Sequence, residues 1–234
     1  MKMPVRTILG AVLAICVGTL HAQTAELPSS KPVQDQSMIR FHFERKGLPV
    51  PVFTLQIHED GSGTYQAEVV GPPLSENSTE SMSRVERTLT LTPATVSKIF
   101  GAAVELRHFN IACESKAKNV ADTGTKTLTY VGEDGTGSCV YNYSQNKDVA
   151  MLTDTFQGIA YTLDEGRRLD FLHRYDRLGL DAEMSAFAEQ AQAGGAIELG
   201  TIAPTLTSIV ADMALIQRVR LQAEKMLVKA KYGN

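Results

Sequence analysis

The sequence predicts an α+β protein: a mostly antiparallel sheet of β-hairpins with one packed helix, followed by a C-terminal helical region of three to four helices. Three observations predict this class. Up to about residue 145, short segments alternate apolar and polar residues, the period of half-buried strands. The string Glu-Asp-Gly-Ser/Thr-Gly joins such segments twice, at 59–63 and 133–137. From Lys147 onward, apolar residues recur every three or four positions. Strand runs followed by helix runs are typical of α+β proteins.

Residues 1–22 have the features of a signal peptide. Lys2 and Arg6 give a positive start, residues 8–20 are apolar and uncharged, and Ala22 is a small residue before the expected cleavage point. The apolar run of 13 residues is shorter than the roughly 20 that a membrane-spanning helix needs. We therefore expect a secreted or periplasmic protein without a transmembrane anchor after signal removal.

The mature chain is mildly acidic. Removing the signal peptide takes away two basic residues and no acidic ones, which lowers the formal net charge from −3 to −5. Nucleic acid is therefore not an expected partner, because phosphate binding requires concentrated positive charge. We expect residues 23–36 to form a flexible leader, residues 37–145 a β-rich α+β domain, and residues 146–234 a helical region.

Strands are expected where apolar and polar residues alternate, at 38–44, 53–58, 64–70, 84–91, 125–131 and 138–143. Asp-Gly between two such segments is a strong hairpin signal, because glycine adopts positive φ without steric cost. The repeated string is compatible with a duplicated unit or with two hairpins that use the same turn. We favour the second interpretation, because the flanking segments do not match. The string also lacks the alternating oxygen ligands of a calcium loop.

The first helix is expected over residues 92–107. Thr92 can accept a hydrogen bond from a free backbone amide, and Pro93 suits the first helical position. After residue 147, Gly166 interrupts the apolar pattern. This interruption predicts a break between two helices.

Two more helices are expected toward the C-terminus. Asp181 can cap a helix over residues 182–192, and Pro204 begins a long one over residues 204–231. We expect the last helix to be continuous and its apolar stripe to be buried within the same chain. The stripe includes Ile209, Met213, Ile216 and Leu227.

Two cysteines remain after signal removal, Cys113 and Cys139. An even number in an exported chain predicts a disulfide between them, and two free thiols are the main alternative. A redox motif requires Cys-x-x-Cys, and a zinc site requires more Cys or His at short spacing. We therefore expect no metal and no cofactor.

One string suggests catalysis. Asp122-Thr123-Gly124 resembles the catalytic loop of the aspartic protease family, in which the Asp is half of a carboxylate pair. The string occurs once here and follows a polar segment. A turn that begins a strand explains the string better, because Asp caps and Gly adopts positive φ.

We expect a non-enzymatic domain that binds a protein or an envelope component. The edge of residues 37–45 and the exposed face of the last helix are candidate contact surfaces. A hydrolase with Asp122 in its site, a structural protein and a small-ligand carrier are the alternatives. Asn77 and Asn142 match the N-glycan acceptor pattern, which applies only where the organism has the machinery.

Overall fold

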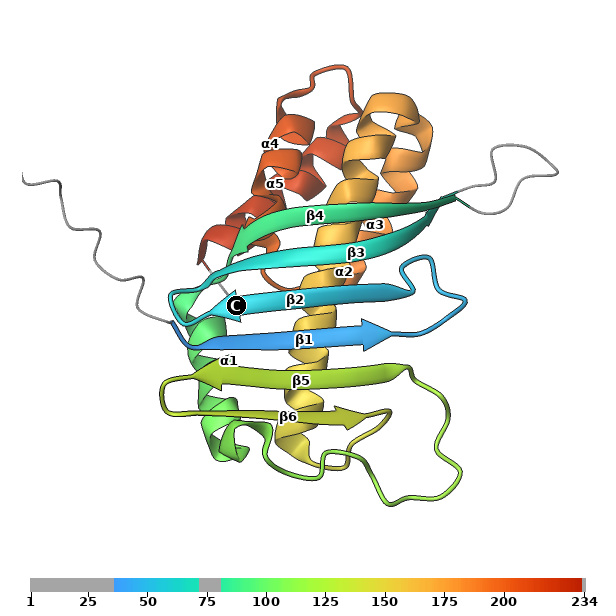
Figure 1. The fold of residues 1–234 in the computed structure, drawn as a ribbon. Helices are drawn as coiled ribbons and strands as arrows, with labels where there is room; N and C mark the ends of the chain where they lie inside the picture. Colours follow the sequence, from blue (N-terminus) through green and yellow to red (C-terminus); the bar gives the residue numbers. More distant parts are fainter. Residues whose placement is uncertain (1–35, 72–80, 233–234) are drawn as a thin grey trace, which may run out of the picture. The chain divides into compact units, whose positions relative to one another are not determined.

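The computed structural model describes residues 36–71 and 81–232, and it confirms the α+β class (Figure 1). The described part contains one six-stranded antiparallel sheet, five α-helices and two short 3-10 helices. The predicted signal peptide, nearly all of the predicted leader and Asn77 lie outside the described residues.

The six strands are joined in the order β4-β3-β2-β1-β5-β6. Their bounds are Met38–Glu44 for β1, Val52–His58 for β2, Ser62–Gly71 for β3, Ser81–Thr90 for β4, Thr125–Gly132 for β5 and Gly135–Tyr141 for β6. Strand β1 pairs with β2 on one side and with β5 on the other. The expectation that residues 37–45 form a free edge is therefore wrong. The edge strands are β4 and β6.

Both Asp-Gly strings form hairpin turns, as predicted. Gly61 joins β2 to β3 with φ +85°, and Gly135 begins β6 with φ +154°. The Asp60 carboxylate accepts a hydrogen bond from the Ser62 backbone amide at 2.8 Å, which holds the first turn. After the first hairpin the chain adds β4 before its helix, whereas a helix follows the second hairpin directly. This difference favours two independent hairpins over a duplicated unit.

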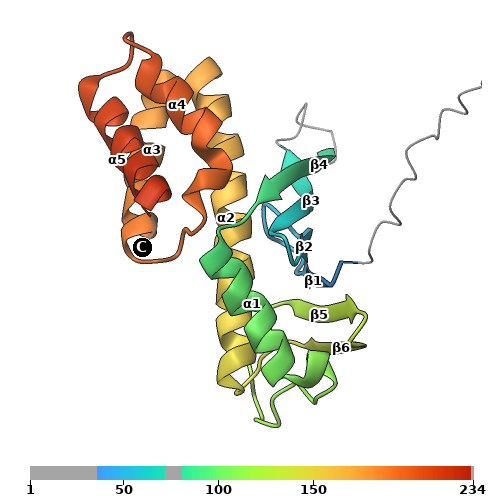
Figure 2. The ribbon, with the colours of Figure 1, turned by 90° about the vertical axis from the view of Figure 1, so that its left-hand side faces the viewer.

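Helices α1 (Pro93–Glu105) and α2 (Lys147–Tyr175) cover one face of the sheet (Figure 2). Successive strand side chains alternate between faces, so Phe41 on β1 points into this core and is fully buried. Its ring stacks on that of Phe156 of α2, with 5.0 Å between centroids. Helix α1 begins as predicted, with the Thr92 hydroxyl accepting a hydrogen bond from the Thr95 amide. Figure 2 shows no described helix on the opposite face of the sheet, which we call the open face.

The predicted break at Gly166 is wrong, because α2 is one continuous helix of 29 residues. Its first half packs on the sheet, and its second half belongs to a separate apolar cluster of the helical region. Gly166 serves close packing instead. A Cβ at this position would lie 2.3 Å from Cγ2 of Ile202, in the 3-10 helix η2 (Leu199–Ile202).

Helix α3 (Arg177–Gln192) begins earlier than predicted, because Asp176 rather than Asp181 caps it. The Asp176 side chain accepts a hydrogen bond from the Gly179 amide at 2.9 Å. Asp181 instead forms an ion pair with Arg218 of the last helix.

The predicted continuous helix over residues 204–231 is wrong. The chain forms α4 (Ala203–Ala211) and α5 (Gln217–Tyr232), separated by a turn at Asp212. The Asp212 carboxylate accepts a hydrogen bond from the Ala214 amide at 2.9 Å and lies 3.0 Å from Nε2 of His173. This turn leaves Met213 78% exposed and Ile216 55% exposed, whereas Ile209 is buried as predicted and Leu227 is partly buried.

The sulfur atoms of Cys113 and Cys139 lie at disulfide distance, with 5.8 Å between the Cα atoms. This pair ties the segment that follows α1 to strand β6, as the sequence predicts. None of the described helices is long and apolar enough to cross a membrane.

Candidate functional site

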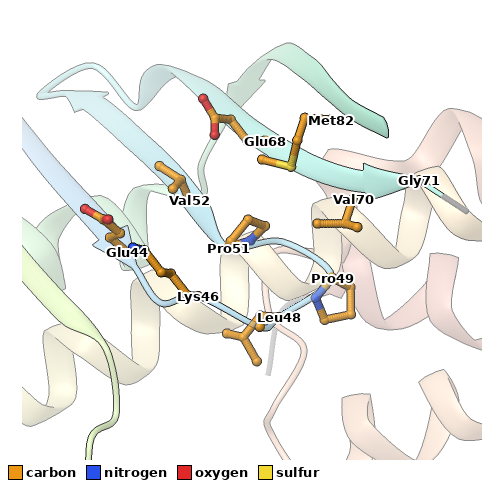
Figure 3. A pocket seen from close by; sticks show the side chains of 11 residues that line it. Glu44, Lys46, Leu48, Pro49, Pro51, Val52, Glu68, Val70, Gly71 and Met82 are labelled. Atoms are coloured by element: carbon orange, nitrogen blue, oxygen red, sulfur yellow. The ribbon is translucent and has the colours of Figure 1, made fainter. Parts of the chain in front are cut away.

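A pocket of about 690 Å³ lies on the open face, where the turn between β1 and β2 meets β3 and β4 (Figure 3). Its apolar lining comes from the turn and from three strands: Leu48, Pro49, Pro51, Val52, Val70 and Met82. Three charged residues, Glu44, Lys46 and Glu68, and two glycines, Gly47 and Gly71, complete the lining. The pocket therefore combines an apolar wall with a charged rim.

Strand register places the two carboxylates on either side of one valine. Val52 of β2 is opposite Glu44 of β1 and opposite Glu68 of β3. All three side chains point to the open face, and Figure 3 shows Glu44 and Glu68 flanking Val52. With strands about 4.8 Å apart, the two glutamate Cα atoms are separated by roughly 10 Å. Within the part of the chain that the structure describes, neither glutamate forms an ion pair.

The turn between β1 and β2 is anchored to the rest of the fold. The Arg45 amide donates to the Pro51 carbonyl at 2.7 Å, and the Val70 amide donates to the Pro49 carbonyl at 2.9 Å. Leu48 packs against the sheet core. The proline backbones also fix φ, so one wall of the pocket is preorganised.

The structure places Asp122 on an exposed turn, and Asp122 does not line the open-face pocket. Its carboxylate accepts a hydrogen bond from the Gly124 amide at 2.9 Å. The buried Lys126 ammonium holds the same turn by donating to the carbonyls of Thr123, Gly124 and Asn142 at 2.8 to 3.1 Å. Burial lowers the pKa of Lys126. These hydrogen bonds show that the Asp-Thr-Gly string forms a turn. The hydrolase alternative stays a prediction.

The Asn142 side chain is engaged on both of its polar atoms. Its Nδ2 donates to the Ala121 carbonyl at 2.9 Å, and its Oδ1 accepts from the Thr123 amide at 2.7 Å. A glycan on Nδ2 would disrupt the first of these contacts, so the structure does not favour Asn142 as an acceptor.

Sequence reasoning missed a strained polar cluster beside the β5–β6 turn. Arg107, His108 and Phe109 are consecutive non-glycine residues in the left-handed region, with φ of 53°, 54° and 64°. The His108 ring stacks on Tyr130, and its Nε2 lies 3.1 Å from the Asp134 carboxylate. Tyr130 donates a hydrogen bond to the same carboxylate at 2.6 Å, which lowers the pKa of Asp134. No glycine or asparagine marks this conformation in the sequence, so these tertiary contacts must stabilise it.

A second cavity, of about 480 Å³, lies between the N-terminus of α1, η2 and α5. Glu198 lines this cavity in a left-handed conformation with φ of 56°. Its carboxylate accepts hydrogen bonds from the Thr92 amide at 3.0 Å and from the Thr92 hydroxyl at 2.6 Å. The carboxylate therefore occupies the helix N-terminus itself and links α1 to the helical region.

Among residues 36–71 and 81–232, no three His, Cys, Asp or Glu side chains come together in a way that can hold a metal ion. No protein-family model matches the chain, and no curated protein matches its sequence. The function must therefore be argued from the geometry of this chain.

Proposed function

We propose that this chain is an exported, non-enzymatic binding domain that receives an extended segment of another protein in the open-face pocket. The segment carries an apolar side chain next to a lysine or arginine. The observation that carries this proposal is an apolar wall beside charged residues of net negative charge. Glu44 and Glu68 form no ion pair among the described residues, and Lys46 is the one cation of the lining.

The pocket is large enough to hold an anchoring side chain. Pockets that bind small ligands have volumes of about 300–1,000 Å³, and this pocket lies within that range. Burying one leucine in it stabilises a complex by about 1.5–3 kcal/mol. The flanking carboxylates favour a basic neighbour, because opposite charges at an interface rim speed encounter and exclude acidic segments.

Export is supported by one feature of the sequence and one of the structure. The segment at 1–22 has the pattern of a signal peptide, and the sulfur atoms of the two remaining cysteines lie at disulfide distance. Disulfides persist mainly in oxidising compartments. The partner is therefore sought among proteins of the periplasm or the cell exterior.

The test uses ten-residue synthetic peptides and isothermal titration calorimetry on the mature chain. A peptide with a central Arg-Leu-Arg is expected to bind. Replacing Leu by Gly is expected to weaken binding by about ten- to 100-fold, which corresponds to the burial of one leucine. A Glu-Leu-Glu peptide is expected not to bind.

Two lysine variants localise the contact. Met82 lines the pocket and is 54% exposed, whereas Val140 is 58% exposed on the far side of the open face, on β6. Met82→Lys removes an apolar wall and adds a charge that repels the arginines, so it is expected to weaken binding. Val140→Lys adds the same charge outside the pocket and is expected to bind as the wild type does. Equal effects of the two variants would contradict the proposal, as would failure of the Arg-Leu-Arg peptide to bind.

A further inference from the structure

The α2–α3 contact buries an ionisable side chain without satisfying it. Glu165 of α2 is only 7% exposed, and no described residue donates a hydrogen bond to its Oε2. An ionised carboxylate in such a place loses its hydration and gains nothing in exchange. The protonated form is therefore favoured at this position.

Glu165 lies one helical turn before Arg168 of α2, and the Arg168 guanidinium reaches Glu183 of α3. The neighbour across the contact is therefore a second carboxylate. Two ionised carboxylates cannot hydrogen-bond to each other, but a carboxylic acid can donate to a carboxylate. Glu183 also forms an ion pair with the Arg168 guanidinium at 2.8 Å. Burial, followed by the hydrogen bond to Glu183, raises the pKa of Glu165 to about 8.

The other charged groups around this pair do not neutralise it. On α2, Asp164 is paired with Arg167 at 2.9 Å, and burial together with the charges of Glu165 and Glu183 raises the pKa of Tyr161 to about 12. From the sheet, Tyr65 faces the Asp164–Arg167 pair.

Of the remaining elements, η2, α4 and α5 pack against α2 or α3. Helices η2 and α4 contain no titratable residue. On α5, Arg218 is paired with Asp181, the Lys229 ammonium is bonded to the carbonyl of Ala191, and the Arg220 guanidinium contacts Sδ of Met213. Arg168 is thus the cation that acts on the Glu165–Glu183 pair, and it binds Glu183.

We propose that the α2–α3 contact is a proton-operated latch, closed while Glu165 and Glu183 share one proton and loosened when both carboxylates are ionised. The latch is independent of the open-face pocket, and its failure would leave the proposed binding function untouched. It makes the helical region tighter in acidic surroundings and looser in alkaline ones.

Proton linkage determines whether a rise in pH opens or closes the α2–α3 contact. Between the ordinary glutamate pKa of 4.5 and the folded value of about 8, the closed state holds one proton that the open state does not. In this window the opening constant rises with pH by up to about tenfold per unit, and it levels off above the folded value. Solvent access to the pair makes the opening constant rise less steeply with pH, but the opening constant still rises.

Hydrogen exchange of the α3 amides, followed by mass spectrometry on the full chain, tests the latch. After correction for intrinsic exchange rates, opening is compared at pH 5.5 and pH 7.5. In the wild type, the opening constant of α3 is expected to be at least fivefold larger at pH 7.5 than at pH 5.5. The interval of two pH units sets an upper limit of about 100-fold. Glu165→Gln cannot ionise, so its opening is expected to change less than twofold.

Glu189→Gln is the matched control, because Glu189 is an exposed carboxylate on the same helix α3. It is expected to retain the wild-type pH dependence. Glu183→Gln removes the second carboxylate and is expected to reduce the dependence, which provides a second test if Glu165→Gln does not fold. A wild-type change below fivefold would overturn the proposal. Full pH dependence in both the Glu165→Gln and Glu183→Gln variants would overturn it as well.

Discussion

Gly166→Ala should destabilise the protein, although alanine is the better helix former. An ideal Cβ at position 166 would lie 2.3 Å from Cγ2 and 2.9 Å from Cβ of Ile202, which is only 1% exposed. Ile202 cannot move into solvent, so the overlap must be relieved inside the core. Overpacking costs about 1–3 kcal/mol, and so deep an overlap falls at the upper end. The higher helix propensity of alanine offsets about 1 kcal/mol of this cost, so the free energy of unfolding should fall by about 2 kcal/mol.

Thermal and urea unfolding measure this loss. For a chain of this size, a loss of about 2 kcal/mol lowers the Tm by roughly 4–8 °C. Gly101→Ala in α1 is the matched control, because no atom lies within 4 Å of its Cβ position, and it should stabilise by about 0.5–1 kcal/mol. Combining Gly166→Ala with Ile202→Ala should cost less than the sum of the two single changes. If Gly166→Ala stabilised the protein as Gly101→Ala does, the close packing of α2 on η2 would be refuted.

Two further predictions concern the segment around the second hairpin. Lys126→Met leaves the carbonyls of Thr123, Gly124 and Asn142 without their donor. Urea unfolding should therefore show a free energy of unfolding that is lower by about 3 kcal/mol. Unchanged stability would show that water replaces the ammonium. Replacing both Cys113 and Cys139 by Ala removes a link across 26 residues, which should cost about 3.5 kcal/mol in the chain-entropy model, and reductant should then have no further effect on the midpoint. Two alkylatable thiols in the untreated wild-type protein would contradict the second prediction.

Local signals in the sequence correctly predicted both hairpin turns and the start of α1. Asp-Gly marks both hairpins because the turn needs positive φ, which glycine supplies. Thr92 and Pro93 mark the start of α1 because capping and fixed φ act within a few residues. The predicted disulfide pair is also consistent with the structure.

Features that depend on distant contacts were missed. Gly166 looks like a helix break, but tertiary packing against Ile202 uses its lack of a side chain. The turn at Asp212 is held partly by His173 of α2, which no short-range pattern reveals. The central place of β1 depends on its pairing with β5, more than eighty positions away.

The candidate site was hidden for the same reason. Its walls come from four strands and one turn, and only strand register brings Glu44, Val52 and Glu68 side by side. The spacing of residues along the chain carries no signal of that kind. Asp122, by contrast, belongs to a local motif that was easy to find, and the structure explains it as a turn.

A nuclear magnetic resonance titration of the mature chain with the Arg-Leu-Arg peptide tests the binding proposal most directly. The proposal predicts saturable amide shifts concentrated in residues 44–52, residues 68–71 and Met82, with small shifts on β6. Absence of saturable shifts would contradict it. Shifts concentrated elsewhere, for example around the exposed Phe171 and Tyr175 of α2, would also contradict it and would place the partner on the helical region.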